Sequence, residues 1–449
     1  MSASADRTTL AAAPLAQRRP PRGRRRPLRV AVVAEWYPSP LDPVHGIWAH
    51  RQALAVRELG VEVHVLALRR PVPPLRTLRA LGEFPPDPAP LRRWLAAQPM
   101  LWRTGELDGI GVTPVPLVAP PRPWSYGSWG WWIAPTLGRA LRALRARWPF
   151  DLVHAHNVVP TAHAAVLSEV WRSGVPVVAS THGPDVIKVP ERGPLARRAL
   201  KTALTRCDLL LANSRWAAER CRALAGLPLA TRVVHLGADL PDPRELPPKH
   251  PRPTIVTVAH LQARKRHETV LQALCALRDR LPLDYLVIGD GEERPRLERL
   301  AAELGLGDRV RFLGQLPHSL ALAEMRRCHA FVMPSVEEPF GVAYVEAMAA
   351  GLPVIASAGE GGPEDIAAAG GGILLVPPGD QEATARAILR ALGPEREQLG
   401  RAARENVRAN FTWRRCGERT VAAYRELLEG PPATTEREDL GSAAVDGVR

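Results

Sequence analysis

The amino-acid sequence of residues 334–356 is PSVEEPFGVAYVEAMAAGLPVIA, and it places two carboxylates eight positions apart around the expected start of a helix. Pro339 and Gly341 suit a loop, and apolar side chains then recur at helical spacing up to Gly351. We therefore predict a helix that begins near Gly341 and ends at Gly351. Residues 353–356 follow at once as a strand, so the segment predicts the loop, helix and strand of an α/β domain.

The start of this helix is suited to an anionic ligand. Its free backbone N–H groups and the helix dipole attract phosphate, and Glu338 and Glu346 flank that point on the order of 10 Å apart at a helical rise. That separation suits hydroxyl groups on either side of a diphosphate, with one carboxylate on a sugar and the other on a ribose. A simpler alternative is that both glutamates only compensate the dipole and face solvent.

The motif around these glutamates resembles that of the family 4 glycosyltransferases. The Phe-Gly pair at 340–341 and the run EAMAAGLPV at 346–354 match the family pattern nearly position by position. The resemblance extends over roughly residues 30–428 and is weakest between 70 and 132. It implies an α/β fold of the GT-B type, in which two Rossmann-like domains face a central cleft and a C-terminal helix crosses back to the first domain.

Length and composition limit the number of domains and the class of protein. With 449 residues the chain is too long for one compact core, and its hydrophobic content of 46% is sufficient for two domains. No stretch approaches the ~18 uninterrupted apolar residues of a membrane-spanning helix, and the N-terminus lacks the apolar core of a signal peptide, so we expect a cytoplasmic protein. Five dispersed cysteines without a CxxC pair suggest neither a disulfide framework nor a zinc cluster.

The net charge of +14 is unevenly distributed. Residues 1–30 hold eight arginines against one acidic residue, Asp6, in a Pro- and Ala-rich segment that we expect to be disordered. Such a tail can contact anionic lipid or RNA, although a merely solvated tail is the simpler interpretation. The charge therefore predicts no specific nucleic-acid site in a folded domain.

Alternating strand and helix patterns divide the chain into two α/β domains. The expected segments are a disordered basic tail, an N-terminal acceptor-side domain, a nucleotide-sugar domain, a crossover helix and a second disordered tail, over residues 1–27, 28–245, 252–410, 411–429 and 430–449. The proline-dense, polar stretch between the two domains is typical of a linker. Residues 70–132 are rich in Pro, Arg and Trp with poor periodicity, so we expect an irregular insertion in the first domain.

Residues 135–148 show an amphipathic helical pattern. Leu137, Leu141 and Leu144 fall on one face, and arginines fall elsewhere. Core packing explains this pattern most simply. A second interpretation is peripheral contact with anionic membrane at its inner face, because many members of the family that the chain resembles use lipid-linked acceptors.

The resemblance also implies which cations face the diphosphate. In the family an Arg-x4-Lys pair follows the first strand of the second domain, and the matching positions here are His260 and Lys265. Lys265 carries over directly as a cation for the leaving group. Imidazole lacks the permanent forked charge of arginine, so Arg264 or Arg266 is expected to supply the charge that His260 does not. No Asp-x-Asp motif suggests a metal, and no cofactor is expected beyond the nucleotide-sugar substrate.

Candidate residues of the first domain lie at strand ends that face the expected cleft. The resemblance implies that His182 lies near the transferred sugar, where it helps to hold the sugar hydroxyls and the oxocarbenium-like transition state. A packing or capping role is the simpler interpretation of a lone histidine. His156 is a weaker candidate, and Asp185 is expected to orient His182 or to bind acceptor. The loop at Gly46 leaves room for the donor phosphate or the acceptor, but it lacks the usual double glycine.

The loop containing Gly46 carries a further likeness. Together with the run YPSP at residues 37–40, it resembles bacterial members that build exopolysaccharides or teichuronic acids. This likeness is an analogy and identifies no acceptor.

These features predict a metal-independent, retaining glycosyltransferase of the hexosyltransferase type that acts on a glycan or lipid-linked acceptor. The resemblance implies that Glu346 binds ribose, that Glu338 binds the donor sugar, and that the Gly341 and Val342 amides lie at the diphosphate with Lys265. Two alternatives stay open. One is a GT-B phosphorylase or nucleotide-sugar epimerase, and the other is a glycan- or lipid-binding protein that kept the fold and lost turnover.

Overall fold

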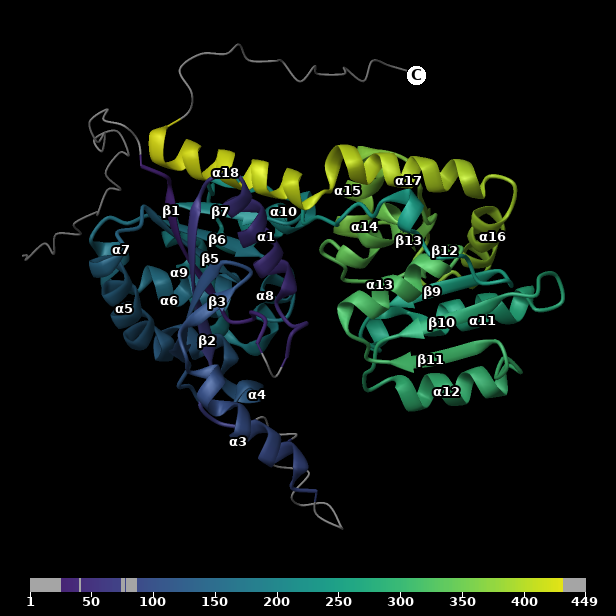
Figure 1. The fold of residues 1–449 in the computed structure, drawn as a ribbon, viewed down its shortest axis with the longest axis horizontal. Helices are drawn as coiled ribbons and strands as arrows, with labels where there is room; N and C mark the ends of the chain where they lie inside the picture. Colours follow the sequence, from purple (N-terminus) through teal and green to yellow (C-terminus); the bar gives the residue numbers. More distant parts are fainter. Residues whose placement is uncertain (1–25, 40–41, 74–76, 78–86, 431–449) are drawn as a thin grey trace, which may run out of the picture.

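The computed structural model describes residues 26–39, 42–73, 77 and 87–430. Two β-sheets, each flanked by helices, form the two halves of the molecule (Figure 1). The tails expected to be disordered lie outside the described residues except for their inner ends. At one of these ends, Arg26 Nη2 lies 2.7 Å from Asp151 Oδ1.

The N-terminal half contains an eight-stranded sheet in the order β3-β4-β2-β1-β5-β6-β7-β8. Only the β3–β4 pair of this sheet is antiparallel among the described strands. The strands are β1 Arg29–Ala34, β2 Glu62–Arg69, β3 Gly105–Leu107, β4 Ile110–Pro116, β5 Leu152–His156, β6 Val177–Thr181, β7 Leu209–Ala212 and β8 Thr231–Val233. The central strands are buried on both faces, which explains their nearly continuous apolar sequences.

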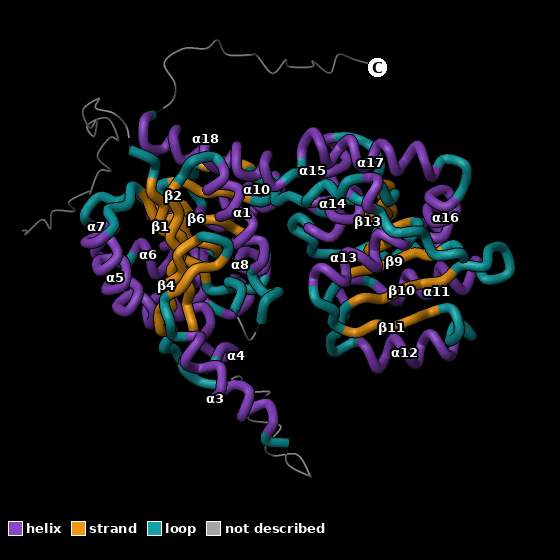
Figure 2. Tube along the Cα trace, in the orientation of Figure 1, coloured by secondary structure: helices purple, strands orange, loops and turns teal. Residues whose placement is uncertain are grey.

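The C-terminal half contains a six-stranded, all-parallel sheet in the order β11-β10-β9-β12-β13-β14. The strands are β9 Thr254–Val258, β10 Asp284–Ile288, β11 Val310–Gly314, β12 Ala330–Met333, β13 Val354–Ser357 and β14 Ile373–Val376. Figure 2 shows the two sheets in orange with helices packed around them. The expectation of two facing α/β domains is thereby met.

Helices connect most of the successive parallel strands. Those of the first half are α1 Ile47–Glu58, α3 Ala89–Leu101, α4 Arg122–Ser125, α5 Trp129–Arg147, α6 His163–Val166, α7 Glu169–Arg172, α8 Pro184–Ile187, α9 Pro194–Arg206 and α10 Arg215–Ala225. Those of the second half are α11 His267–Leu277, α12 Arg294–Glu303, α13 His318–Arg327, α14 Val342–Ala349, α15 Gly361–Ala369, α16 Gln381–Leu392 and α17 Arg396–Asn410. The last helix is α18 Trp413–Glu429.

The segment 70–132 is more regular than predicted. It contains α3, the β3–β4 hairpin and α4, and β4 pairs in parallel with β2 as a strand of the main sheet. The expectation of an irregular insertion is therefore wrong for these stretches. Pro114 and Pro116 within β4 weakened its strand pattern, and α3 buries none of its residues, so core packing imposes no apolar periodicity on its sequence.

Helix α5 packs the apolar face of its amphipathic pattern in the core, as the simpler interpretation expected. It begins at Trp129, earlier than expected, and Leu137, Leu141 and Leu144 are fully buried. The apolar face is thus packed inside the first domain. No helix in the described part of the chain is long and apolar enough to cross a membrane.

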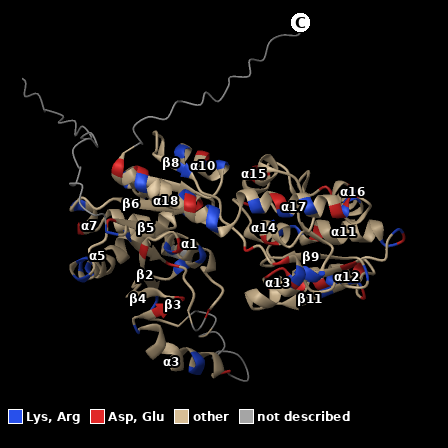
Figure 3. Cartoon of the chain, turned by 45° about the horizontal axis from the view of Figure 1, so that its top comes forward, with Lys and Arg blue, Asp and Glu red and all other residues tan. Residues whose placement is uncertain are grey.

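Helix α18 returns from the second half and packs on the first (Figure 1). The Gln52 amide of α1 donates to Thr420 Oγ1 at 2.9 Å, and a Cβ at Gly417 would lie 2.7 Å from the carbonyl oxygen of Ala55. The predicted crossover helix is present. Figure 3 shows basic and acidic positions interspersed along α17 and α18, rather than a surface of one sign.

Both sheets change direction of winding at a defined point. Helical connections lead outward in opposite directions from β1 and β5 in the first sheet and from β9 and β12 in the second. Ligands of doubly wound sheets bind beyond the carboxyl ends of strands at such points. The loops after these four strands are therefore the place to look for a site.

Candidate active site

One buried tyrosine, Tyr344, anchors the loop between β12 and α14. The Tyr344 hydroxyl donates to the carbonyl of Met333 at 2.7 Å and lies 2.7 Å from Ser335 Oγ. Gly341 precedes α14 with φ of 81°, and a Cβ there would lie 2.4 Å from the Tyr344 ring. The sequence PFG thus turns the chain sharply onto the start of the helix.

The first turn of α14 is open toward an anionic ligand. No side chain of the described residues caps it, and it contains no acidic residue. Its N–H groups, including those of Gly341 and Val342, therefore keep the partial positive charge of a helix N-terminus. The sequence predicted a phosphate site at this position, and the backbone geometry suits one.

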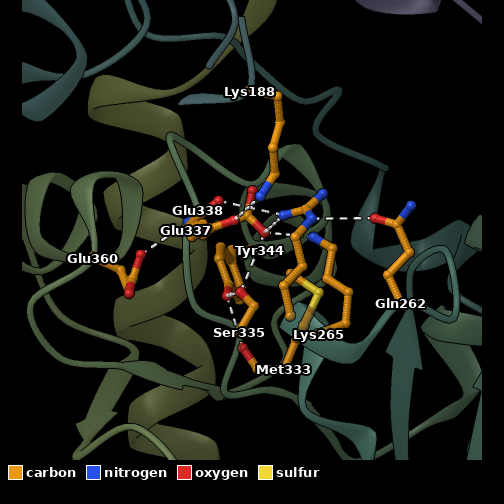
Figure 4. Close-up of polar contacts among 10 residues, drawn as sticks. Lys188, Gln262, Lys265, Met333, Ser335, Glu337, Glu338, Tyr344 and Glu360 are labelled. Atoms are coloured by element: carbon orange, nitrogen blue, oxygen red, sulfur yellow. Dashed lines mark hydrogen bonds and ion pairs between the residues drawn. The ribbon is translucent and has the colours of Figure 1, made fainter. Parts of the chain in front are cut away.

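Glu338 lies just before this turn and is buried (Figure 4). The Lys265 ammonium makes an ion pair with Glu338 Oε2, which also accepts a hydrogen bond from Ser335 Oγ at 3.2 Å. Burial raises the pKa of Glu338, but the charges of Lys265 and Arg264 outweigh that effect and hold it below its usual value. Burial likewise lowers the pKa of Lys265. The two strand-end loops thus present a buried pair of opposite charges beside the helix start.

Glu360 anchors the backbone of the same loop. Its carboxylate accepts the N–H of Glu338 at 2.8 Å, and the Glu338 carbonyl accepts the N–H of Gly362 at 3.2 Å. A Cβ at Gly362 would lie 1.9 Å from the carbonyl oxygen of Phe340. The glycines of residues 359–362, at the start of α15, therefore let this helix approach the motif closely.

The 3-10 turn Ala263–Lys265, which follows β9, determines which neighbouring arginine faces Glu338. Arg264 Nη1 lies 3.7 Å from Glu338 Oε2 and donates to the Glu337 carbonyl at 3.3 Å, so it faces the motif. Arg266 is exposed in a left-handed conformation and lines a separate cavity with Glu268. Of the two arginines expected to replace the missing charge, the structure brings Arg264 to the site and turns Arg266 away.

Glu346 points to a cavity of about 160 Å³ between the two halves. Trp48, Arg51, Asp239 and His318 line it together with Val342, Glu346, Ile47, Leu322, Arg326 and Trp413. His318 Nε2 donates to Glu346 Oε1 at 2.7 Å, and this hydrogen bond raises the pKa of His318. The second carboxylate of the motif therefore lines an interdomain cavity.

The first half contributes the N-terminus of α1 to this cavity. Gly46 caps α1 with φ of 80°, and a Cβ there would lie 2.2 Å from the Trp36 carbonyl. The His45 ring packs against the Trp36 ring, tilted by 32° with 4.5 Å between ring centres, and lies 6.4 Å from the His260 ring across the cleft. His260 is exposed at the end of β9. The structure thus brings Gly46 and His260 to the same cleft.

His182 lies at the end of β6 beside His156 at the end of β5. Their rings are stacked at 5.2 Å, and His156 Nδ1 and His182 Nε2 share a hydrogen bond of 3.0 Å. Burial lowers the pKa of His182 to about 4, so the ring is neutral at pH 7. Its Nδ1 is buried and has no partner among the described residues. A neutral imidazole with one unused nitrogen can bind a sugar hydroxyl.

Asp185 supports these loops rather than facing the cleft. Its buried carboxylate accepts from the Val158 N–H at 2.8 Å, the Thr181 hydroxyl at 2.9 Å and the Gly183 N–H at 3.0 Å. It therefore fixes the backbone on both sides of His182. Of the two roles expected for Asp185, its contacts fit orientation and not acceptor binding.

The two halves meet directly at the motif. A Cβ at Gly183 would lie 1.9 Å from Cγ of Pro339, so only glycine permits this approach. Lys188 Nζ also lies 2.8 Å from Glu337 Oε2 across the cleft (Figure 4). His182 and Glu338, which are 156 positions apart in the chain, are each one residue from this contact.

Two family models match the chain in succession. The model described as Glycosyltransferase Family 4 matches residues 45–241, and the one described as Glycosyl transferases group 1 matches residues 241–406. A D-inositol 3-phosphate glycosyltransferase of Catenulispora acidiphila is 31% identical over 75% of this chain and 85% of its own length. This chain is a family 4 glycosyltransferase.

The similarity of this glycosyltransferase extends to further proteins. A GDP-mannose-dependent phosphatidylinositol monomannoside mannosyltransferase of Mycolicibacterium smegmatis is 29% identical over 66% of this chain and 81% of its own length. The structure of sucrose-phosphate synthase from Thermosynechococcus elongatus superposes with a TM-score of 0.67 at 23% identity, covering 90% of this chain and all of that one. The fold is GT-B, and the enzyme transfers a sugar from a nucleotide-sugar donor.

Several residues of the glycosyltransferase site were not predicted. His318, Arg51 and Asp239 line the cavity, and Glu360 holds the Glu338 backbone. His318 follows β11, so its place after a parallel strand was an available signal. Nothing local in the sequence pairs it with Glu346.

Proposed function

We propose that this enzyme transfers a hexose-type sugar, with retention of anomeric configuration, from a nucleoside diphosphate to a glycan or lipid-linked acceptor. The observation that carries the proposal is the placement of the uncapped α14 start, Lys265, Glu338 and Glu346 against His182 at one interdomain cleft. In this assignment Glu346 binds the ribose in the cavity. The diphosphate lies at the α14 amides, and the sugar lies between Glu338 and His182.

The same contacts suggest how the leaving group is stabilised. Charge develops on the diphosphate as the glycosidic bond breaks, and Lys265, Arg264 and the α14 dipole lie where they can neutralise it. The diphosphate competes with Glu338 for Lys265. The released carboxylate then accepts hydrogen bonds from sugar hydroxyls, while neutral His182 binds another. The acceptor hydroxyl attacks from the face that the diphosphate leaves.

We also propose that this neutralisation needs no metal ion. The protein supplies two side-chain cations and a helix N-terminus at one point, which is the charge that a metal would otherwise bring. Full activity in excess EDTA is the expected result. A dependence on added Mg²⁺ or Mn²⁺ would contradict it.

Peripheral contact with anionic membrane is a further part of the proposal. Trp131 and Trp132 at the start of α5 and Leu95 and Met100 of α3 are exposed, on helices that also carry arginines. Exposed aromatic and apolar side chains near basic ones favour an interfacial position. Cosedimentation with anionic but not neutral vesicles is expected. The absence of such cosedimentation would contradict the proposed membrane contact.

The first experiment is calorimetric titration of the enzyme with UDP, GDP and ADP and their common sugars. One nucleotide is expected to bind, and Glu346→Ala should weaken its binding at least tenfold because the ribose hydroxyls lose their side-chain acceptor. Glu303→Ala, on an exposed position of α12, is the matched control and should bind as the wild type does. No binding of any nucleotide to the wild type would overturn the donor assignment. NMR of the first product then reports its anomeric configuration.

A further inference from the structure

A buried carboxylate stands at the switch point of the first sheet, outside the donor site. Glu35 follows β1 and its side chain is only 4% exposed. It accepts a hydrogen bond from the Tyr126 hydroxyl at 2.8 Å and makes an ion pair with Arg122. Tyr126 also reaches the carbonyl of Val159 at 3.3 Å, in the loop after His156. The group therefore borders the histidines that face the donor sugar.

The Arg122 guanidinium is enclosed by aromatic rings. Its central carbon lies 4.4 Å from the ring centres of both Trp36 and Tyr126 and 5.2 Å from that of Trp129. Stacking and the ion pair with Glu35 fix its orientation. Its side chain is still 36% exposed, so the pair with Glu35 does not shield it fully from solvent.

Two more arginines stack on the same rings. The guanidinium of Arg70 lies 4.9 Å from the Trp129 ring centre, and that of Arg192 lies 5.3 Å from that of Tyr126. Arg70 Nη2 donates to the Ala119 carbonyl at 3.0 Å, but its Nε is buried without a partner among the described residues. Together with Arg122, these residues form the arginine cluster.

Two members of the arginine cluster, Arg70 and Arg122, share one carboxylate among the described residues. Glu35 pairs with Arg122, and burial followed by the positive charge of Arg122 lowers the pKa of Arg70, which the charge of Glu35 only partly offsets. The cluster is adjacent to the donor side as well, because Trp36 contacts the His45 ring and His45 lies opposite His260. Two guanidiniums that share one carboxylate on this side of the cleft favour an anion on the acceptor.

We propose that the arginine cluster binds a phosphate group of the acceptor. Phosphate suits it better than a single carboxylate because planar, stacked guanidiniums present paired N–H groups to tetrahedral oxygens from more than one side. The proposal rests on the proposed function, since it concerns the acceptor side of the same cleft. The phosphate belongs either to a soluble phosphomonoester or to a lipid headgroup.

The test uses the full-length enzyme saturated with the nucleotide that it binds, so that the donor phosphate site is filled. Inorganic phosphate and glycerol 1-phosphate are titrated calorimetrically, and phosphatidylcholine vesicles with and without phosphatidic acid are used for cosedimentation. The variants are Arg70→Gln and Arg122→Lys, the second of which leaves Glu35 paired with a cation. Arg206→Gln is the matched control because Arg206 stacks on Trp171 away from the cleft.

Phosphate binding to the nucleotide complex is expected, weakened roughly tenfold by each cluster variant and unchanged in the control. If soluble phosphates fail but phosphatidic acid-dependent cosedimentation is lost in both cluster variants, the source is a lipid. Binding that neither variant alters, or no binding by any phosphate probe, would overturn the inference. If nucleotide binding is intact, either of these two results contradicts only the phosphate site and leaves the proposed function standing. The proposed function itself fails only if the wild-type enzyme binds no nucleotide.

Discussion

Lys265 and Glu338 illustrate how a single pair of side chains serves both stability and catalysis. Both are buried, and a buried charge without a partner is costly, so each depends on the other in this structure. A donor diphosphate offers Lys265 a second anion and frees Glu338 for the sugar. The pair is therefore poised to be exchanged rather than permanent.

Glu338→Gln tests this dual role. The buried Lys265 ammonium then lacks its counter-charge, so the free energy of unfolding should fall by about 3–5 kcal/mol and kcat/KM should fall at least a hundredfold. The double variant Glu338→Gln with Lys265→Met should recover most of the stability and none of the activity. Chemical denaturation and steady-state kinetics measure both. Equal stability of the single and double variants would contradict the argument.

Strand-to-helix loops do the positioning in both halves. The loop from β6 to α8 contains Gly183, with φ of 104°, and packs on Pro339 in the loop from β12 to α14. Backbone groups on each loop are held by carboxylate acceptors, Asp185 on one side and Glu360 on the other. The distance between His182 and Glu338 thus depends on a contact that no larger residue permits.

Gly183→Ala should force the two loops apart. We expect at least a tenfold loss of kcat/KM, because small displacements of positioning groups cost rate steeply. Gly193→Ala is a matched control, since Gly193 has φ of 102° and a Cβ there would meet no atom of the described residues within 4 Å. The control should lose about 1–3 kcal/mol of stability through backbone strain and keep its activity. Equal activity of the two variants would show that the contact is unimportant.

The whole molecule carries several buried histidines that remain neutral in the folded state. Burial lowers the pKa of His154 to about 3 and that of His182 to about 4. His154 is also tied to the crossover helix, because its Nδ1 lies 2.7 Å from the Tyr424 hydroxyl of α18. Protonation of this ring therefore opposes both the sheet packing and the attachment of α18.

Stability should consequently fall in acid. Between pH 6.5 and about 4 the unfolded chain binds protons at these histidines and the folded chain does not, so the free energy of unfolding rises with pH across this window. The slope approaches about 1.4 kcal/mol per pH unit for each histidine and vanishes above the unfolded pKa. His154→Gln should reduce the slope measured by denaturation from about pH 4.5 to 7.5. An unchanged slope would contradict this assignment.

The strands and the donor motif were predictable because their signals are local. Buried parallel strands are continuous apolar runs, and Glu338, Glu346 and Lys265 lie in short stretches with a recognisable pattern. β4 was missed because prolines interrupt its pattern, and α3 was missed because it has no buried face. The arginine cluster was missed because its members are far apart in sequence and are joined only by the first sheet.

Local apolar periodicity and turn residues decide which segments of this chain become strands, helices and helix starts, since those depend on neighbours within a few positions. Those patterns sufficed for two α/β domains and an anion site before α14, whereas the crossover of the last helix was implied by the resemblance to family 4. Tertiary packing decided that Arg264 rather than Arg266 faces Glu338, that His318 meets Glu346, and that His182 reaches the motif through Gly183 and Pro339. Contacts between residues distant in sequence follow from the way the sheets and helices pack in three dimensions, and no local pattern encodes them.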